Sequence, residues 1–527
     1  MATIFGDTSG SLTGTQKGKN QILVGIDNQD NTLVGDADTI TDHAKGGNDT
    51  LIGGSNSDSG DVSNNLRGDA FTMSGFARGG NDTLIGGSNS GSGTVSNDFR
   101  GDAVSMSDFA QGGNDTVTGG SNSGDGTVMN LGSGDTLLLS GSAQGGNDIM
   151  TGGNNSGNGS VFNGFGADAL SMTDNAQGGN DTLTGGNNSG RGSVANSFGG
   201  DAQVMSDFTQ GGNDHLTGGN NSGGGFVEND LFGDAVLMSD SARGGNDIVS
   251  GGDENGSGDV TNVLDGDALE MSDTAKGGND TMTGGDNNGS GDVFNGLAAD
   301  ARLMSGSAQG GNDTLTGGNN TADGTVLNLL SGDAVFMSNS AHGGNDNITG
   351  GNSSGSGSLE NDLMGDAVNM SDSARGGNDI LSGGNNSGSG YQENDLFGDA
   401  VRMFDTARGG NDILIAGTAI AGSTVTNLMW GDAAVMSGSA IAGQDTFVFK
   451  DNLAAGQTVG IFNFVEDFSQ TQHDVIEFSG VAGVTSFANL SFDTTTDPGS
   501  TIIHAGADQV TLLAFTGTLT AHDFLIV

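Results

Sequence analysis

Aspartates recur along this chain at a spacing that could bring carboxylates together. In one column, each Asp closes a Gly-Gly-Asn-Asp tetrapeptide and lies 33 residues after the previous member of the column. A degenerate copy, Ala442-Gly443-Gln444-Asp445, keeps the same spacing. If the repeats stack as β-coils ~4.8 Å apart, neighbouring charges repel by roughly 0.9 kcal/mol in water and roughly 3.5 kcal/mol at an effective dielectric of about 20. We therefore expect this column to bind cations through Asp49, Asp82, Asp115, Asp148, Asp181, Asp214, Asp247, Asp280, Asp313, Asp346, Asp379 and Asp412.

A second aspartate column keeps the same period and runs from Asp36 to Asp432, mostly within Gly-Asp-Ala. Its alternative role is to cap the adjoining turn, just as a single Asp in a Gly-rich turn is often only a turn former. A third acidic column (Asp108, Asp174, Asp207, Asp240, Asp273, Asp372 and Asp405) alternates with Gly and Asn, and we expect it on the surface. From the second column the predicted ligands are Asp69, Asp102, Asp234, Asp267, Asp333, Asp366 and Asp399.

Among cations, Ca²⁺ suits these residues best. It takes six to eight oxygen ligands and accepts backbone carbonyls beside carboxylates, whereas Mg²⁺ demands tight octahedral geometry. Zn²⁺ would need Cys or His, and the chain has no Cys and only 6 His.

Short strands and Gly-rich turns must position these carboxylates. Val62, Asn64 and Leu66 alternate with polar residues, and their equivalents recur in nearly every copy, which is typical of a strand with one buried face. An Asn column from Asn31 to Asn427 lies on that face, where stacked side chains can satisfy one another. Two further strands are expected around residues 50–52 and 70–73, with turns such as 53–57 between them.

Three strands in 33 residues predict one three-sided coil per repeat. The fold class is thus all-β, a parallel β-solenoid (β-helix or β-roll); two smaller coils per repeat are the alternative. We expect an N-terminal cap over residues 1–30, a solenoid of about thirteen repeats over 31–445 and a Phe-rich, β-rich secretion or capping domain over 446–527. A Met column, from Met73 to Met436 with Leu139 as its one substitute, is expected to fill the core.

Composition narrows the function classes. The formal charge of −51 disfavours nucleic acid and anionic membranes as partners. The first residues lack the basic and apolar regions of a cleaved signal peptide, and no stretch is apolar enough for a transmembrane helix. No nucleophile motif, metalloprotease motif or phosphate-binding loop stands out from the repeats, so we expect no enzyme.

One segment of each repeat is similar to a known motif. Residues 80–87, Gly-Asn-Asp-Thr-Leu-Ile-Gly-Gly, resemble the glycine-aspartate nonapeptide of the RTX (repeats-in-toxin) calcium-binding β-roll proteins. The tail, with Asp445–Phe449, Val465–Phe468, His473–Ile476 and His522–Val527, is similar to the C-terminal target domain of type I secreted proteins. The resemblance implies calcium-dependent folding and export through a type I channel. RTX proteins carry nonapeptides in tandem, whereas here one occurs per 33 residues.

Together these features predict a secreted, calcium-binding structural protein that self-associates into a cell-surface layer, filament or matrix. An ice-binding solenoid is the alternative, because Thr182-Leu183-Thr184 and similar triplets form outward Thr pairs, although His215 and Ile248 interrupt the row. A surface adhesin is a third candidate.

Overall fold

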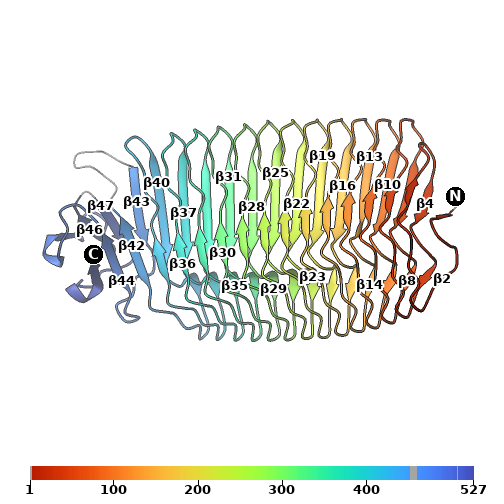
Figure 1. Ribbon diagram of the computed structural model, residues 1–527. Coiled ribbons are helices and arrows are strands. Elements are labelled where there is room, and N and C mark those ends of the chain that lie inside the picture. The colour runs from red at the N-terminus through yellow and green to blue at the C-terminus, as the bar shows by residue number, and fades with distance from the viewer. Residues whose placement is uncertain (1–2, 451–459, 507) are drawn as a thin grey trace. The chain divides into compact units, whose positions relative to one another are not determined.

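The computed structural model describes residues 3–450, 460–506 and 508–527. It is all-β, a parallel β-solenoid of about 14 coils, which confirms the predicted fold class. The chain forms two compact units, Met1–Gly278 and Asn279–Val527, and Figure 1 labels strands of both.

Each regular coil contributes one strand to each of three sheets. We name these the Asn sheet, the Met sheet and the Thr sheet after the columns that they carry, and β10 (Thr94–Arg100), β11 (Ser105–Met106) and β12 (Thr116–Thr118) are the three strands of one coil. Strand β10 pairs in parallel with β13, and Val95 lies opposite Val128, one repeat further on. One repeat is therefore one coil, and the alternative of two smaller coils is wrong.

The N-terminal unit follows this plan throughout. Its Asn sheet contains β1 (Thr3–Phe5), β4 (Asn31–Val34), β7 (Val62–Arg67), β10, β13 (Thr127–Ser133), β16 (Ser160–Gly166), β19 (Ser193–Gly199), β22 (Phe226–Phe232) and β25 (Asp259–Asp265). Its Met sheet contains β2 (Ser11–Leu12), β5 (Thr39–Ile40), β8 (Thr72–Met73), β11, β14 (Leu138–Leu139), β17 (Ser171–Met172), β20 (Val204–Met205), β23 (Ala235–Met238) and β26 (Ala268–Met271). Its Thr sheet contains β3 (Ile22–Val24), β6 (Thr50–Ile52), β9 (Thr83–Ile85), β12, β15 (Ile149–Thr151), β18 (Thr182–Thr184), β21 (His215–Thr217) and β24 (Ile248–Ser250).

The C-terminal unit has the same three sheets. Its Asn sheet contains β28 (Val293–Ala298), β31 (Val326–Ser331), β34 (Leu359–Met364), β37 (Tyr391–Phe397), β40 (Thr424–Trp430) and β43 (Gly460–Val465). Its Met sheet contains β29 (Ala301–Met304), β32 (Ala334–Met337), β35 (Ala367–Met370), β38 (Ala400–Met403) and β41 (Ala433–Met436). Its Thr sheet contains β27 (Thr281–Thr283), β30 (Thr314–Thr316), β33 (Asn347–Thr349), β36 (Ile380–Ser382), β39 (Ile413–Ile415), β42 (Thr446–Lys450), β44 (Val475–Ser479) and β48 (Phe524–Ile526).

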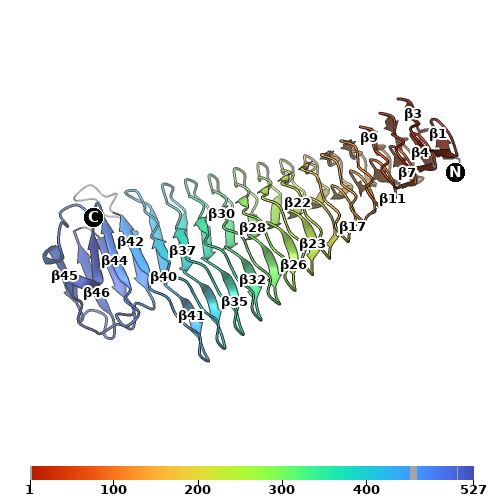
Figure 2. The same ribbon diagram turned by 60° about the horizontal axis from the view of Figure 1, so that its bottom comes forward.

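The two predicted end regions are built onto these sheets. Within the predicted cap, strands β1, β2 and β3 pair in parallel with β4, β5 and β6, so its described residues form a shorter coil. In the predicted C-terminal region, β42, β43 and β44 prolong the Asn and Thr sheets, and β45 (Leu490–Asp493), β46 (Thr501–Ala505) and β47 (Asp508–Leu512) form an antiparallel set (Figure 2). Two 3₁₀ turns, Phe487–Asn489 and Ala521–Asp523, complete this region. Residues 1–2, 451–459 and 507 of the predicted domains lie outside the described residues.

The core is a stack of narrow apolar layers. Strand β7 alternates between buried and half-buried residues, which places Val62, Asn64 and Leu66 inside, and the Met column is buried from Met73 to Met403. Some coils depart from the pattern, as at Gly132 and at Ser353. Where Gly132 replaces the usual large residue, the rings of Phe99 and Phe165 approach to 6.3 Å.

The second departure is in the C-terminal unit. There Ser353 replaces an inward Asn, and the buried Gln392 side chain accepts a hydrogen bond from the Ser353 N–H at 3.2 Å. Its amide group donates to the Gly351 carbonyl at 3.1 Å, so both the oxygen and the nitrogen of this buried side chain are hydrogen-bonded to the backbone.

The Asn column satisfies itself, as predicted. The Asn130 amide group donates to Oδ1 of Asn163 at 2.8 Å and to the Gly120 carbonyl at 2.9 Å. Its own Oδ1 accepts from Asn97 Nδ2 and from the Gly120 N–H. Every polar atom of this buried side chain is thus paired, which removes the penalty for burying an amide.

Candidate metal centre

Both aspartate columns point into the solenoid. Asp82 lies immediately before β9 and Asp69 lies in the corner between β7 and β8. Every predicted ligand of both columns is at most 2 % exposed. The third acidic column is on the surface, as predicted, and its members adopt left-handed backbone angles such as φ 64° at Asp108.

Backbone N–H groups hold one oxygen of each inward carboxylate. Oδ2 of Asp69 accepts from the Gly80 N–H at 2.8 Å, so this Asp does cap the adjoining turn. The Asp82 N–H donates to Oδ1 of Asp115, one coil further on, at 2.6 Å. The contact repeats along both units, and it fixes the orientation of the carboxylates without a side-chain donor.

The other oxygen of most of these carboxylates is buried without a hydrogen-bond donor. In the first column these residues are Asp49, Asp82, Asp115, Asp148, Asp181, Asp214, Asp313, Asp346, Asp379, Asp412 and Asp445. In the second column they are Asp36, Asp69, Asp102, Asp135, Asp168, Asp234, Asp300, Asp333, Asp366 and Asp399. Buried polar atoms are almost always paired in proteins, so a repeated row of unpaired acidic oxygens calls for a ligand.

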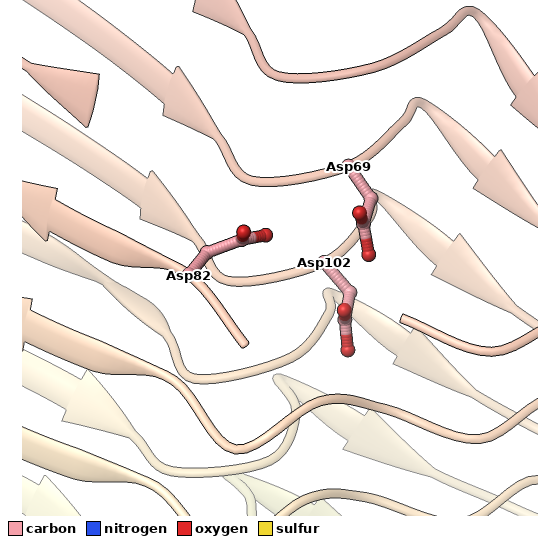
Figure 3. Close-up of side chains that lie close together, drawn as sticks. All are labelled: Asp69, Asp82 and Asp102. Atoms are coloured by element: carbon pink, nitrogen blue, oxygen red, sulfur yellow. The ribbon is translucent and has the colours of Figure 1, made fainter. Parts of the chain in front are cut away.

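In the N-terminal unit the two columns converge. The side chains of Asp69, Asp82 and Asp102 lie close together in Figure 3, with Asp82 pointing toward the other two, and each offers an oxygen within 4.8 Å of the other two. Four further groups of this kind are Asp102–Asp115–Asp135, Asp135–Asp148–Asp168, Asp168–Asp181–Asp201 and Asp234–Asp247–Asp267. Because successive groups share a carboxylate, the first four form a continuous series. We call the two inward aspartate columns together the carboxylate ladder.

Glycine is required around the ladder because the acidic oxygens lie against the backbone. A Cβ on Gly68 would lie 2.0 Å from the unpaired Oδ2 of Asp82 and 1.7 Å from the Gly101 carbonyl oxygen. A Cβ on Gly79 would lie 1.8 Å from Oδ1 of Asp102. The glycines of Gly-Asp-Ala and Gly-Gly-Asn-Asp thus admit carboxylate and carbonyl oxygens to one small volume.

Burial makes these carboxyl groups hard to ionise without a cation. It raises the pKa of Asp115 well above its usual range, and the neighbouring Asp102 and Asp148 raise it further. It also raises the pKa of Asp168 to about 6, against the lowering effect of contacts with Asp201 and Asp135. Burial therefore favours a bound cation or a proton at these carboxyl groups.

The donor set fits Ca²⁺. All ligand atoms are oxygens, and those of one group lie within 4.8 Å of one another, which lets a single Ca²⁺ contact them at Ca²⁺–oxygen distances of roughly 2.4 Å. Each coil contributes two inward carboxylates, so one divalent ion per coil would neutralise them. Each group consists of Asp alone, without Cys or His, which disfavours Zn²⁺.

The ligand prediction omitted several members of these groups. Asp135, Asp168 and Asp201 are fully buried within them, and Asp300 is equally buried in the C-terminal unit. Asp135 and Asp168 have different neighbours from Gly-Asp-Ala, namely Gly134 with Thr136 and Ala167 with Ala169. Their position in the 33-residue column was the signal, and it does not depend on the flanking residues.

Comparison with protein-family models, curated proteins and solved structures gave no match. Among the residues that the structure describes, no helix has the length and apolarity to cross a bilayer.

The outward Thr pairs of β18, β27 and β30 do face away from the core. Ice binding and adhesion stay predictions.

Replacing Asp115 by Asn should have opposite effects with and without calcium. Asn keeps the acceptor for the Asp82 N–H and directs an amide toward Asp102 and Asp135, so the calcium-free protein should gain about 2 kcal/mol. The calcium-loaded protein should lose one ion and become less stable than wild type. Urea unfolding at pH 6, with calcium and with chelator, measures both effects.

Asp108→Asn is the matched control, since it makes the same charge change at an exposed position in the same coil. It should shift stability by less than about 0.5 kcal/mol in both conditions. Destabilisation of the chelator-treated Asp115→Asn protein would contradict the view that this carboxylate is unfavourable without a cation.

Proposed function

We propose that this protein is a secreted structural scaffold whose solenoid forms when calcium fills the carboxylate ladder. The observation that carries the proposal is the row of buried carboxylate oxygens without hydrogen-bond donors. In each group of three carboxylates, oxygens lie close enough together to bind one ion. Calcium is the abundant hard divalent cation outside cells, where modules that bind it with Kd values of roughly 0.1–1 mM are filled.

The same ladder supports a link between folding and export. Two inward carboxylates per coil oppose stacking where calcium is scarce, so the chain would stay unfolded inside the cell and fold outside. This matches what the resemblance to RTX proteins and to type I target domains implies. A chain without Cys is also independent of the redox state of either compartment.

A structural role follows from the uniformity of the molecule. Its polar interior, from the Asn column to the ladder, repeats from coil to coil instead of converging on one singular cluster. Repeated surfaces are suited to repeated contacts, and we propose self-association into a cell-surface layer, filament or matrix.

Calcium titration of the refolded protein tests the proposal. Far-ultraviolet circular dichroism should show β-structure with millimolar calcium at pH 8 and its loss with chelator, while matching magnesium should restore much less. Electron micrographs of the same samples should show ordered assemblies only with calcium. Chelator-treated protein that keeps its β-structure at pH 8 would overturn calcium-dependent folding, and calcium-loaded protein that stays monomeric at high concentration would overturn the assembly role.

A further inference from the structure

We propose that Lys19 is a built-in cation that closes the N-terminal end of the carboxylate ladder, where each later coil takes a divalent ion. The inference rests on the proposed function and makes it more specific, because it says at which coil the series of bound calcium ions ends. It is carried by the contacts of the first coil, which replaces the ladder residues one by one.

The backbone aligns the first coil with the ladder. The Asp7 N–H donates to the Asp36 carbonyl, just as the Asp36 N–H donates to the Asp69 carbonyl, so Asp7 belongs to the second aspartate column. The Gln21 N–H donates to Oδ1 of Asp49 at 2.6 Å, the contact that Asp49 itself makes with Asp82. Gln21 therefore occupies the place of the Gly-Gly-Asn-Asp aspartate.

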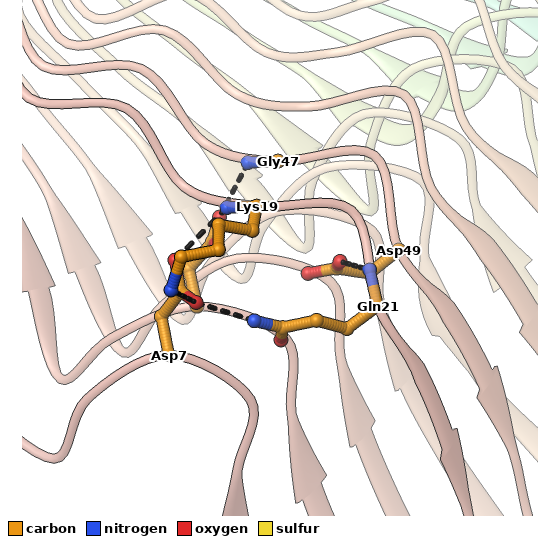
Figure 4. Close-up of polar contacts among 6 residues, drawn as sticks. Asp7, Lys19, Gln21, Gly47 and Asp49 are labelled. Carbon is orange, nitrogen blue, oxygen red and sulfur yellow. Dashed lines mark hydrogen bonds and ion pairs between the residues drawn. The ribbon is translucent and has the colours of Figure 1, made fainter.

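Asp7, Gln21 and Asp36 thus correspond to Asp69, Asp82 and Asp102, with one carboxylate replaced by an amide. Lys19 Nζ lies 3.0 Å from Oδ1 of Asp7, and the Lys19 N–H donates to Oδ2 at 2.9 Å (Figure 4). The Gln21 amide also donates to Oδ1 of Asp7. This terminal carboxylate, whose side chain is only 8 % exposed, has donors on both oxygens.

Sterics explain why only the first coil carries a lysine at this position of the repeat. Lys19 stands at the second Gly of the tetrapeptide, the place of Gly47 and Gly80. In the regular coils of the N-terminal unit a Cβ there would meet the preceding coil's carbonyl, at 1.4 Å for Gly80. In the first coil this position carries a side chain, and that side chain delivers an ammonium group to the ladder carboxylate.

The C-terminal unit ends its columns in a related way. Gln472 Nε2 donates to Oδ2 of Asp432 at 3.0 Å, and Oδ1 of Asp432 accepts from the Gly443 N–H. Asp474, which accepts from the Asp445 N–H, also accepts from the Ser469 N–H at 2.7 Å. At each terminus, then, protein donors pair both oxygens of the last carboxylate of the second column, Asp7 at one end and Asp432 at the other.

The test is to restore the regular residues and count ions. The double variant Lys19→Gly/Gln21→Asp gives the first coil three carboxylates and removes the ammonium group. Native mass spectrometry of the calcium-loaded full chain should then find one calcium more than in wild type. Lys17→Gly, which removes a charge from the same coil at an exposed position, should leave the count unchanged.

The outcomes separate the two claims. A wild type that retains no calcium would overturn the proposed function, and the inference with it. A wild type that retains calcium, together with a double variant of the same count, would overturn the inference alone. A gain of one ion in the double variant but not in Lys17→Gly supports it.

A second measurement applies if the double variant does not fold. Lys19→Met removes the ammonium group and keeps the side-chain bulk, so amide hydrogen exchange of residues 3–25 in calcium-loaded protein should become at least fivefold faster. Lys17→Met is its control and should leave these rates unchanged. Equal rates in Lys19→Met and wild type would show that the ammonium group does not stabilise the end of the ladder.

Discussion

Without calcium, the protein should resist urea better at pH 5 than at pH 8, the reverse of its behaviour with calcium. The buried ladder carboxyl groups have pKa values above their usual value of 3.8, at about 6 for Asp168 and for Asp333. The folded state therefore holds more protons than the unfolded state between these values. The free energy of unfolding then falls as the pH rises from about 4 through 6 and beyond.

The effect is large because many groups act in the same direction. A shift of about two pKa units, as for Asp168, corresponds to about 3 kcal/mol of lost stability for one group above its folded pKa. Several such groups exceed the roughly 5–15 kcal/mol that stabilises a typical domain. Bound calcium removes the penalty only while the carboxylates are ionised, so the calcium-loaded protein should weaken on acidification.

Urea titrations at pH 5, 6, 7 and 8, each with calcium and with chelator, would measure both trends. The two curves of stability against pH should cross. A chelator-treated protein whose stability rises with pH, as in ordinary acid denaturation, would contradict the view that burial favours the protonated form of these carboxyl groups.

Replacing Gly146 by Ala should prevent its coil from stacking. A Cβ at this position would lie 1.4 Å from the carbonyl oxygen of Gly113 in the preceding coil, so the backbones must separate and their pairing must break locally. We expect a loss of at least about 4 kcal/mol, in the range that only severe steric or buried-polar changes reach. Urea unfolding in saturating calcium gives the size of the loss.

Gly60→Ala is the matched control, because a Cβ at this position would have no atom within 4 Å and the backbone there is not left-handed. It should remain within about 1 kcal/mol of wild type. A Gly146→Ala protein that is as stable as the control would show that the coils do not stack at this spacing.

The fold could be predicted from the sequence because residues at equivalent positions of successive repeats occupy the same environment, either buried or exposed. Alternation placed Asn130 on the buried face, and its period placed another Asn on each side. Burial of the Met column and exposure of Asp108 followed from the same argument.

The composition of the candidate site was harder to predict. Asp69, Asp82 and Asp102 are 13 and 20 residues apart in sequence, and only the backbone at the corners determines that their oxygens meet. The role of Lys19 was hidden for another reason. Thr3 pairs with Thr32 and Leu12 with Ile40, spacings of 29 and 28 residues, so a search at the period of 33 does not align the first coil.

The irregular coils carry a consequence for how the chain finds its register. Nearly identical repeats could slip by one whole coil and keep the Asn contacts and most carboxylate contacts, as β-strands with few distinguishing side chains tend to do. Phe99 and Phe165 meet across Gly132, and the buried Gln392 hydrogen-bonds the Ser353 N–H and the Gly351 carbonyl. A chain that slipped by one coil would crowd one layer of the core and leave a cavity in another. The irregular coils therefore favour the native register over slipped ones, which a perfect repeat could not do.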